Sequence, residues 1–326
     1  MLFGLYPLRF SFRARDELYF PPGKSSNILR GAFGTLFRRM ACTPDCPGAK
    51  VCEHRATCPY ARIFEPSSTT AGPSGLADWP RPFVFRATHL DGRTLPAGTP
   101  FHFDLNFFDM AHPAIAYFVL TFAQLAREGL GPKRCKVDLL RVTQLHPAAE
   151  IYTGDSMRLE PPTEPLEIDL AKPTETTSRI TIRFLTPTEL KTHAALADRP
   201  EFSILADRPE FSILAARARD RISALRALYG PGPLDLDFRA FGDRATAIRM
   251  TRCDTKQIDI TRRSTKTGQQ HSIGGFIGEA DYEGDLTEFL PYLRAAEYTG
   301  IGRQTVWGKG QISVSTEPRF WTHRMH

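Results

Sequence analysis

The sequence lacks any long hydrophobic run, and no stretch of its 326 residues approaches the roughly 18 apolar residues of a membrane span. The first ten residues also lack the basic start, the apolar stretch and the small-residue cleavage site of a signal peptide. With 41% hydrophobic and 24% charged residues, the composition is that of a soluble globular protein long enough for two domains. We therefore expect a cytoplasmic protein with no membrane partner.

Positive charge is in slight excess, with a formal net charge of +6, and it is unevenly spread. Residues 239–266 hold more than twice as many cations as acids. The cations are Arg239, Arg244, Arg249, Arg252, Lys256, Arg262, Arg263 and Lys266, against Asp243, Asp254 and Asp259. A local surplus of this kind favours a polyanionic partner such as a nucleic acid.

Hydrophobic periodicity predicts a complete α+β unit in the first half. Leu8, Phe10 and Phe12 alternate with polar residues, which is the period of a half-buried strand. A helix capped by Ser25 or Ser26 should follow. The predicted elements after the first strand are a helix over 27–40, strands over 81–88 and 101–108, a helix over 112–128 and a strand over 136–145. This order, βαββαβ, is that of a ferredoxin-like domain, which we assign to residues 1–150.

The same order repeats after residues 151–178, a segment rich in Pro, Thr and Glu that we interpret as a connector. The predicted elements are strands over 179–186, 245–260, 272–282 and 309–315, with helices over 210–229 and 286–298. We therefore predict two tandem ferredoxin-like domains, the second over residues 179–326. Four-stranded sheets of this type are also the scaffold of RNA-recognition modules.

A nine-residue segment is duplicated without substitution, since residues 197–205 and 206–214 both read ADRPEFSIL. Each copy contains a proline, which argues against a continuous helix through both copies. We expect one copy to form an extra loop before the helix that begins near residue 210.

Four cysteines, Cys42, Cys46, Cys52 and Cys58, lie in a proline-containing insertion over residues 41–80 that has few apolar residues of its own. Four thiolates satisfy tetrahedral Zn²⁺, and a closed structural site would stabilise such a segment. His54 is available to replace one cysteine. The alternative is a flexible loop with reduced thiols.

A glycine-rich loop over residues 300–310 (GIGRQTVWGKG) follows the last predicted helix. Glycines expose backbone N–H groups, cations attract phosphates, and an indole offers a face for a base. Thr305 stands where a dinucleotide fingerprint requires its third glycine, so that motif is excluded. The predicted RNA-binding residues are Gly300, Gly302, Arg303, Gln304, Trp307, Gly308, Lys309 and Gly310, together with Arg262, Arg263 and Lys266. The alternative is a structural turn with a core tryptophan.

At these motifs the sequence resembles the CRISPR-associated endoribonucleases of the RAMP superfamily, which cut precursor CRISPR RNA within its repeats. The resemblance rests on residues 29–34 (LRGAFG), 58–65 (CPYARIFE), 184–191 (FLTPTELK), 275–286 (GFIGEADYEGDL) and 300–310. It implies two ferredoxin-like domains, recognition of repeat RNA, cleavage without a metal or other catalytic cofactor, and retention of the processed CRISPR RNA. The alternative within this superfamily is a non-catalytic subunit that holds the RNA in a CRISPR effector complex.

The implied chemistry is attack by the ribose 2′-OH on the adjacent phosphorus, which requires a base, an acid and cationic donors. Relatives often use a histidine near the first helix, yet no histidine occurs before His54. Tyr19, Lys24 and Arg38 stand where the family's catalytic groups tend to lie, and His54 is the nearest imidazole. Each of the four also has an ordinary structural interpretation, in packing, in a turn, on a helix face or at the metal.

Overall fold

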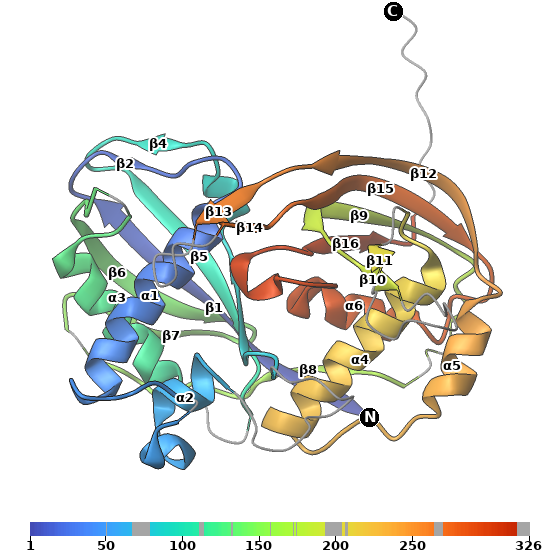
Figure 1. Cartoon of the computed structure of the whole chain (residues 1–326), viewed down its shortest axis with the longest axis horizontal. Helices are drawn as coiled ribbons and strands as arrows, with labels where there is room; N and C mark the ends of the chain where they lie inside the picture. Colours follow the sequence, from blue (N-terminus) through green and yellow to red (C-terminus); the bar gives the residue numbers. More distant parts are fainter. Residues whose placement is uncertain are drawn as a thin grey trace, which may run out of the picture.

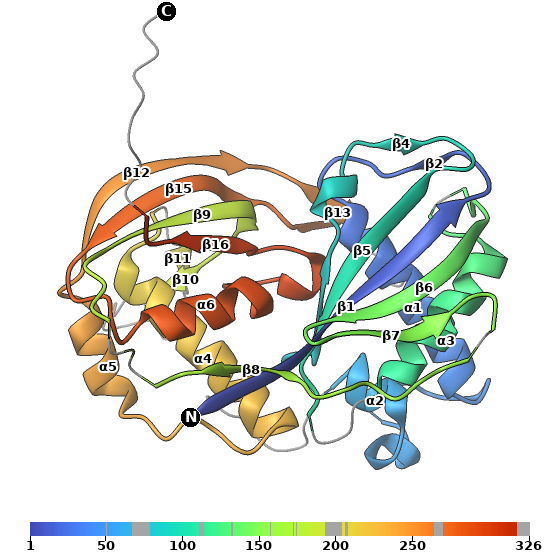
Figure 2. The ribbon, with the colours of Figure 1, turned by 180° about the vertical axis from the view of Figure 1, so that it is seen from behind.

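The computed structural model of the protein describes residues 1–49, 51–66, 79–110, 114–131, 133–156, 158–171, 173, 175–192, 204–205, 208–263 and 270–317. Two antiparallel sheets lie side by side, each with helices on one face (Figures 1 and 2). This arrangement confirms the predicted α+β class. Among the described residues, no helix is long and apolar enough to cross a membrane.

The first sheet has the ferredoxin-like strand order, with an added strand at one edge. The order is β3-β5-β1-β6-β7, in which β6-β1-β5-β3 reproduces the predicted unit. Its elements are β1 (Leu2–Ala14), α1 (Ser25–Ala41), β3 (Phe83–Arg86), β5 (Pro100–Phe107), α3 (Ile115–Glu128), β6 (Val137–Leu145) and β7 (Ala148–Thr153). Short elements lie between them: β2 (Leu18–Tyr19), η1 (Glu53–Ala56), α2 (Pro59–Ile63), η3 (Thr88–Leu90) and β4 (Thr94–Leu95).

The second sheet repeats this topology in the order β12-β15-β9-β16. Its elements are β9 (Arg179–Thr188), α4 (Phe211–Tyr229), α5 (Phe238–Ala245), β12 (Arg249–Ile258), β15 (Gly275–Glu283), α6 (Leu290–Thr299), η4 (Thr305–Trp307) and β16 (Ile312–Ser315). Two small ladders accompany it, β10 (Lys191–Thr192) with β11 (Ile204–Leu205) and β13 (Thr261–Arg263) with β14 (Gln270–Ser272). Helix α6 begins later than predicted because Pro291 occupies its first turn, where no backbone donor is needed.

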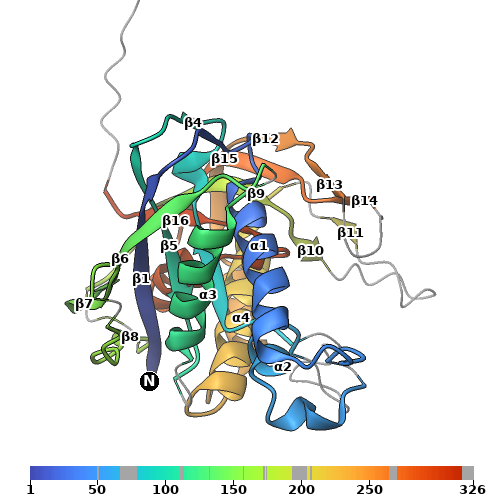
Figure 3. The same cartoon turned by 90° about the vertical axis from the view of Figure 1, so that its left-hand side faces the viewer.

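Aromatic side chains fill the space between the first sheet and helices α1 and α3, which lie next to each other over it (Figure 3). The ring of Phe33 on α1 stacks on that of Phe118 on α3, with 4.4 Å between centroids. On the sheet, Phe10 stacks on Phe103 of the neighbouring strand at 5.1 Å. The alternation seen in the sequence of β1 therefore points these phenylalanines into one core, which holds α1 in place.

Strand β1 extends beyond this core into the second one. Its first residues, Leu2 to Leu5, pair with β8 (Leu166–Asp169), and Phe3 and Leu5 are buried with the side chains of the second domain. The interpretation of residues 151–178 as a plain connector was therefore wrong for the part that forms β8. Leu166 and Ile168 pack against the second core, and their alternation is masked by the surrounding prolines and acids.

The two copies of the duplicated segment adopt different structures. In the second copy, Phe211 begins α4, and Phe211 and Leu214 are buried. In the first copy, Ile204 and Leu205 form β11, and residues 197–203 lie outside the described residues, so the predicted extra loop cannot be followed there. Identical residues thus form a helix in one copy and a strand in the other, because tertiary packing overrides local propensity.

Candidate functional site

The glycine-rich loop of the second domain packs directly against the first turn of α1 in the first domain. Gly308 has φ 76° and lies so close to Ser26 that a Cβ atom at this position would clash with the Ser26 side chain. Gly302 has the same φ, and a Cβ there would clash with the carbonyl of Glu189. At both positions only glycine combines the required backbone angle with the close approach.

Backbone N–H groups of the loop are largely used within the protein. The N–H of Ile301 donates to the Gly310 carbonyl at 2.8 Å, that of Arg303 to the Glu189 carbonyl at 3.0 Å, and that of Gly310 to the Pro187 carbonyl at 3.0 Å. The bonds of Arg303 and Gly310 therefore fix the loop to the end of β9, and the bond of Ile301 joins the two ends of the loop. In this conformation these donors do not face solvent as free phosphate ligands, which corrects the expectation of bare backbone donors along the loop.

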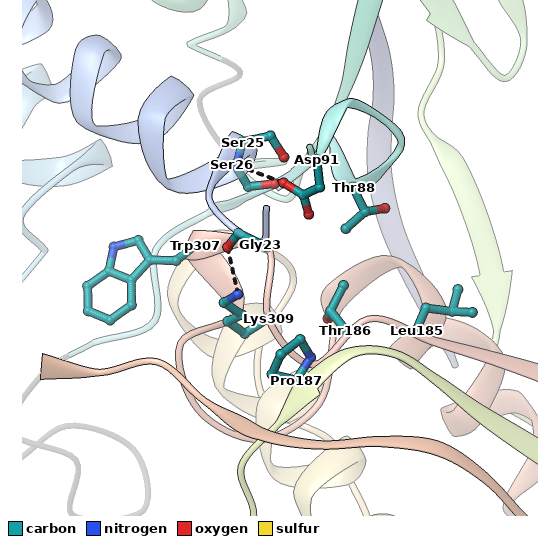
Figure 4. A pocket seen from close by; sticks show the side chains of 11 residues that line it. Gly23, Ser25, Ser26, Thr88, Asp91, Leu185, Thr186, Pro187, Trp307 and Lys309 are labelled. Atoms are coloured by element: carbon teal, nitrogen blue, oxygen red, sulfur yellow. Dashed lines mark hydrogen bonds between the residues drawn. The ribbon is translucent and has the colours of Figure 1, made fainter. Parts of the chain in front are cut away.

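Lys309 is buried at the junction of the two domains. Its residue is 3% exposed, and its Nζ atom donates to the Gly23 carbonyl at 2.9 Å. The pKa of Lys309 is lowered to about 8, mainly by burial; the carboxylate of Asp91 acts against this shift, and the nearby charge of Lys24 adds to it. The loop thus brings the Lys309 amine to the cavity that Asp91 also lines (Figure 4), and the charge of Lys24 acts on the same amine.

A cavity of about 160 Å³ opens at this point between the loop and α1. Figure 4 shows the side chains of Ser25, Ser26, Thr88 and Asp91 on one side of it and Lys309 on the other. The remaining lining residues are Gly23, Leu185, Thr186, Pro187, Trp307 and Gly308. We call this space the junction cavity.

Asp91 organises the beginning of α1. Its Oδ1 atom accepts the N–H of Ser25 at 2.9 Å, whereas the Ser25 hydroxyl donates to the Ala87 carbonyl at 2.7 Å. The N-cap residue is Lys24, and α1 has no capping bond from that side chain. The prediction that Ser25 or Ser26 caps α1 was therefore wrong, because a carboxylate from the loop after β3 takes this role.

A larger groove of about 550 Å³ adjoins the junction cavity and shares Gly23, Leu185 and Pro187 with it. The remaining lining residues are Pro22, Lys24, Ile258, Asp259, Ile260, Thr261 and Ile277. The groove therefore runs from the first turn of α1 to the start of β13. The predicted RNA-binding residues Arg262 and Arg263 lie in β13, next to this lining, and Lys266 lies outside the described residues.

The four catalytic candidates do not meet in one place. Lys24 lines the groove, and Tyr19 lies in β2 with 45% of its surface exposed. Arg38 is 14 positions further along α1, roughly 21 Å at the rise of an α-helix, and its Nη2 atom donates to the Cys46 carbonyl. His54 lies in η1 of the cysteine-rich insertion. The structure therefore brings Lys24 to the glycine-rich loop and places Arg38 and His54 with the cysteines.

The predicted RNA-binding cations are partly engaged in ion pairs. Arg303 pairs with Glu189 while half of its side chain stays exposed, and the Gln304 amide donates to the Ser272 carbonyl at 2.9 Å. Trp307 is half-buried, with the guanidinium of Arg30 5.4 Å from its ring. In the basic segment the pairs are Arg244 with Glu288, Arg249 with Glu283, and Arg252 with Glu279 and Asp281. Its charge surplus is thus smaller at the surface than in the sequence.

The four clustered cysteines are all half-buried free thiols. Cys42 lies beside Cys46 and Cys58, and burial together with these neighbours raises the pKa of Cys42 to about 12. Cys46 also lies beside Cys52, and the Gly48 backbone N–H lowers the pKa of Cys46. In the described part of the chain, no three or more His, Cys, Asp or Glu residues are placed to hold a metal ion. The donor types suit Zn²⁺ but the arrangement is not a formed site, so the structural zinc stays a prediction.

Sequence reasoning did not identify Ser26, Thr88 and Asp91 as site residues. Ser26 was noticed only as a possible cap, and Thr88 and Asp91 lie in an unremarkable segment after β3. No periodicity or motif marks them, because they reach the junction cavity only when the two domains pack together. A carboxylate and two hydroxyls beside two lysines can bind a phosphate and exchange protons with it.

Comparisons with known proteins agree with this architecture. Residues 182–312 match the family model described as CRISPR-associated endoribonuclease Cas6, and residues 3–164 match the AF_1859 N-terminal domain. An uncharacterized protein of Archaeoglobus fulgidus is 24% identical over 184 residues, which span 55% of this chain and 62% of that protein.

Solved structures show a similar fold. A Cas6 product complex is 17% identical to this chain, and the match covers 95% of this chain and 100% of the Cas6 chain, with a TM-score of 0.57. Thermus thermophilus Cas6 is 16% identical, and the match covers 96% of this chain and 98% of the Cas6 chain, with a TM-score of 0.50. A partial Cas6-RT-Cas1–Cas2 complex is 11% identical, covers 99% of this chain and 47% of that chain, and has a TM-score of 0.56. These likenesses agree with tandem ferredoxin-like domains.

Proposed function

We propose that this chain is a Cas6-type CRISPR-associated endoribonuclease, since residues 182–312 match that family model, and that it cuts precursor CRISPR RNA within its repeats without a metal. The observation that carries the proposal is the buried amine of Lys309, which the glycine-rich loop places beside Lys24 and Asp91 at the junction cavity. Two cations and a carboxylate at the mouth of an interdomain groove suit an RNA phosphodiester and a proton-transfer reaction.

The reaction transfers the phosphorus from one ribose oxygen to another. The 2′-oxygen attacks the adjacent phosphorus, the bond from phosphorus to the 5′-oxygen breaks, and the products are a 2′,3′-cyclic phosphate and a 5′-OH. Asp91 accepts the proton of the 2′-OH, and Lys309 donates a proton to the departing 5′-oxygen. Lys24 and Lys309 stabilise the extra charge on the phosphorane.

The pKa of Lys309 supports the role of proton donor. Burial lowers it to about 8, so the amine is protonated near neutral pH and gives up its proton more easily than an ordinary lysine. Asp91 has a second task, since it also accepts the Ser25 N–H. Asp91→Asn keeps an oxygen that can accept this bond and removes the base, so it should abolish cleavage while leaving the fold and RNA binding nearly unchanged.

The direct test is incubation of the purified protein with its adjacent repeat RNA in EDTA. We expect a single cut that leaves a 2′,3′-cyclic phosphate, and a 2′-deoxy substitution at the cut should abolish cleavage with binding retained. Cleavage of the deoxy-substituted RNA at the normal rate would contradict the mechanism. A strict requirement for added Mg²⁺ would contradict metal independence. We also propose that the processed RNA stays bound, which co-purification of protein and product would test.

A second function has one observation in its favour. No histidine is among the residues that line the junction cavity, and histidine is the commonest proton-transfer group. The protein would then hold the repeat-derived RNA as a non-catalytic subunit of a CRISPR effector complex. Tight binding of the intact repeat with no product after prolonged incubation would favour this function over cleavage.

A further inference from the structure

The hydroxyl of Ser26 is buried in the junction cavity without a hydrogen-bond partner. Ser26 is 4% exposed, and its Oγ atom has no partner among the described residues. A buried hydroxyl of this kind costs free energy unless something satisfies it. Since Ser26 lines the junction cavity, a molecule that enters this space is in a position to supply the missing partner.

Three further features of the junction cavity select for an anion. Ser26 lies in the first turn of α1, a 17-residue helix whose N-terminal end carries partial positive charge and N–H donors without helical acceptors. Lys309 lines the same cavity, and Lys24 stands close enough to depress its basicity. Asp91 is the opposing charge, but its Oδ1 atom is already bound to the Ser25 N–H.

We infer that Ser26 Oγ, Lys309 Nζ and the first turn of α1 form a phosphate-binding subsite that holds a phosphodiester of the RNA. The hydroxyl donates to one phosphate oxygen and the lysine pairs with the negative charge, the arrangement by which helix N-termini bind phosphates. The close approach of Gly308 to Ser26 fits this task, because the loop reaches the helix end at a position that has no side chain. The identity of the ligand as RNA rests on the proposed function, whereas anion binding does not.

The neighbouring serine provides a matched control. Ser25 is equally buried, but its hydroxyl donates to the Ala87 carbonyl at 2.7 Å, so it stabilises the fold. Ser25→Ala should therefore lower the melting temperature. Ser26→Ala removes an unpartnered hydroxyl and should leave the melting temperature of the free protein unchanged or raise it.

The experiment measures melting temperatures of wild type, Ser26→Ala and Ser25→Ala against inorganic phosphate, with potassium chloride at matched ionic strength. Phosphate also stabilises proteins without binding a site, so the difference between variants is the readout. Phosphate should raise the melting temperatures of wild type and Ser25→Ala by similar amounts. Ser26→Ala should require about tenfold more phosphate for the same rise, as expected for the loss of a hydrogen bond to a charged group. An unchanged phosphate response in Ser26→Ala would overturn the subsite, and so would a loss of stability equal to that of Ser25→Ala.

A second arm identifies the source of the phosphate. Repeat RNA made uncleavable by 2′-deoxy substitution at the cut should bind wild type several-fold more tightly than Ser26→Ala, and equal affinities would overturn the assignment to RNA. A wild-type protein that shows the expected phosphate and RNA binding but cuts no RNA would support the subsite and refute the proposed cleavage. The two proposals can therefore fail separately.

Discussion

Arg86 on β3 and Arg221 on α4 hold the same end of α6, one from each domain. Arg86 Nη2 donates to the Glu297 and Tyr298 carbonyls at 3.0 Å, and Arg221 Nε donates to the Thr299 carbonyl at 2.9 Å. Burial, together with the nearby charge of Arg221, lowers the pKa of Arg86 to about 9. The partial negative charge of the helix C-terminus offsets the cost of burying two cations. The glycine-rich loop starts at the next residue, so its position depends on both arginines.

Replacing Arg86 with methionine should destabilise the protein and loosen the loop. The variant keeps an unbranched stem but leaves two buried carbonyls without this donor, so we expect a loss of roughly 2 kcal/mol in the free energy of unfolding. Denaturant unfolding measures the change. Arg158→Met, which removes an exposed arginine paired with Glu160, is the control and should have little effect. Equal stabilities of the two variants would show that the arginine clamp on α6 contributes nothing.

RNA affinity should fall between pH 7 and pH 9 because Lys309 loses its charge near pH 8. Asp91 and Lys24 are the charged groups that act on this amine. Binding at pH 7, 8 and 9 and constant ionic strength, in wild type and Lys309→Met, isolates the effect. Lys309→Met should bind RNA more weakly than wild type at pH 7, and its RNA affinity should not show the part of the fall between pH 7 and pH 9 that is due to Lys309. Parallel declines in both proteins would exclude Lys309 as the titrating group.

Rising pH should increase the contribution of Lys309 to protein stability, whereas it should decrease RNA affinity. An unfolded lysine keeps its proton up to about pH 10.4, whereas the folded protein releases it near 8. Between these values the unfolded state binds more protons, so the contribution of Lys309 to stability is unfavourable below pH 8 and is relieved as the pH rises. The stability difference between wild type and Lys309→Met should therefore shift in favour of wild type from pH 7 to pH 9.

Trp307→Ala separates RNA contact from packing. The ring is half-buried and lies beside the Arg30 guanidinium, so an RNA base has access to part of it. Loss of base stacking should cost roughly 1–3 kcal/mol of RNA binding, and the loss of stability should stay below the roughly 3–5 kcal/mol of a fully buried aromatic. Trp307→Phe keeps a ring and serves as the control. If stability falls by the full core value while RNA affinity is unchanged, the loop is a structural turn.

The cysteine insertion should hold about one Zn²⁺ per chain when the protein is purified without chelator. Cys42→Ser and Cys58→Ser should lower the folding yield more than they alter cleavage by the protein that survives, because a closed site stabilises without taking part in chemistry. Cys253→Ser, on β12 and away from the cluster, is the matched control. Metal analysis decides the matter, and less than about a tenth of an equivalent of any metal would refute the site.

Local sequence patterns were sufficient to predict most helices and strands, because the periodicity that marks each element is carried by residues close together in the sequence. The alternation around Phe10 predicted β1, and the helical spacing around Phe33 predicted α1. Strand β8 was missed because the prolines and acids around it mask the alternation of Leu166 and Ile168. The site was only partly predictable for a different reason. Lys24 and Lys309 were visible as cations, but their meeting with Asp91 depends on how the two domains pack.

The strand that serves two cores also decides how this protein can be dissected. Four side chains of the first domain complete the apolar interior of the second domain. They are Phe3 and Leu5 from β1, Val84 from β3, and Phe108 directly after β5. A fragment that contains only the second domain would have cavities in its core where these side chains pack. A fragment that contains only the first domain would expose the same side chains to solvent. The halves are therefore not interchangeable modules. Grafting the second domain onto another protein would require the first strand to travel with it.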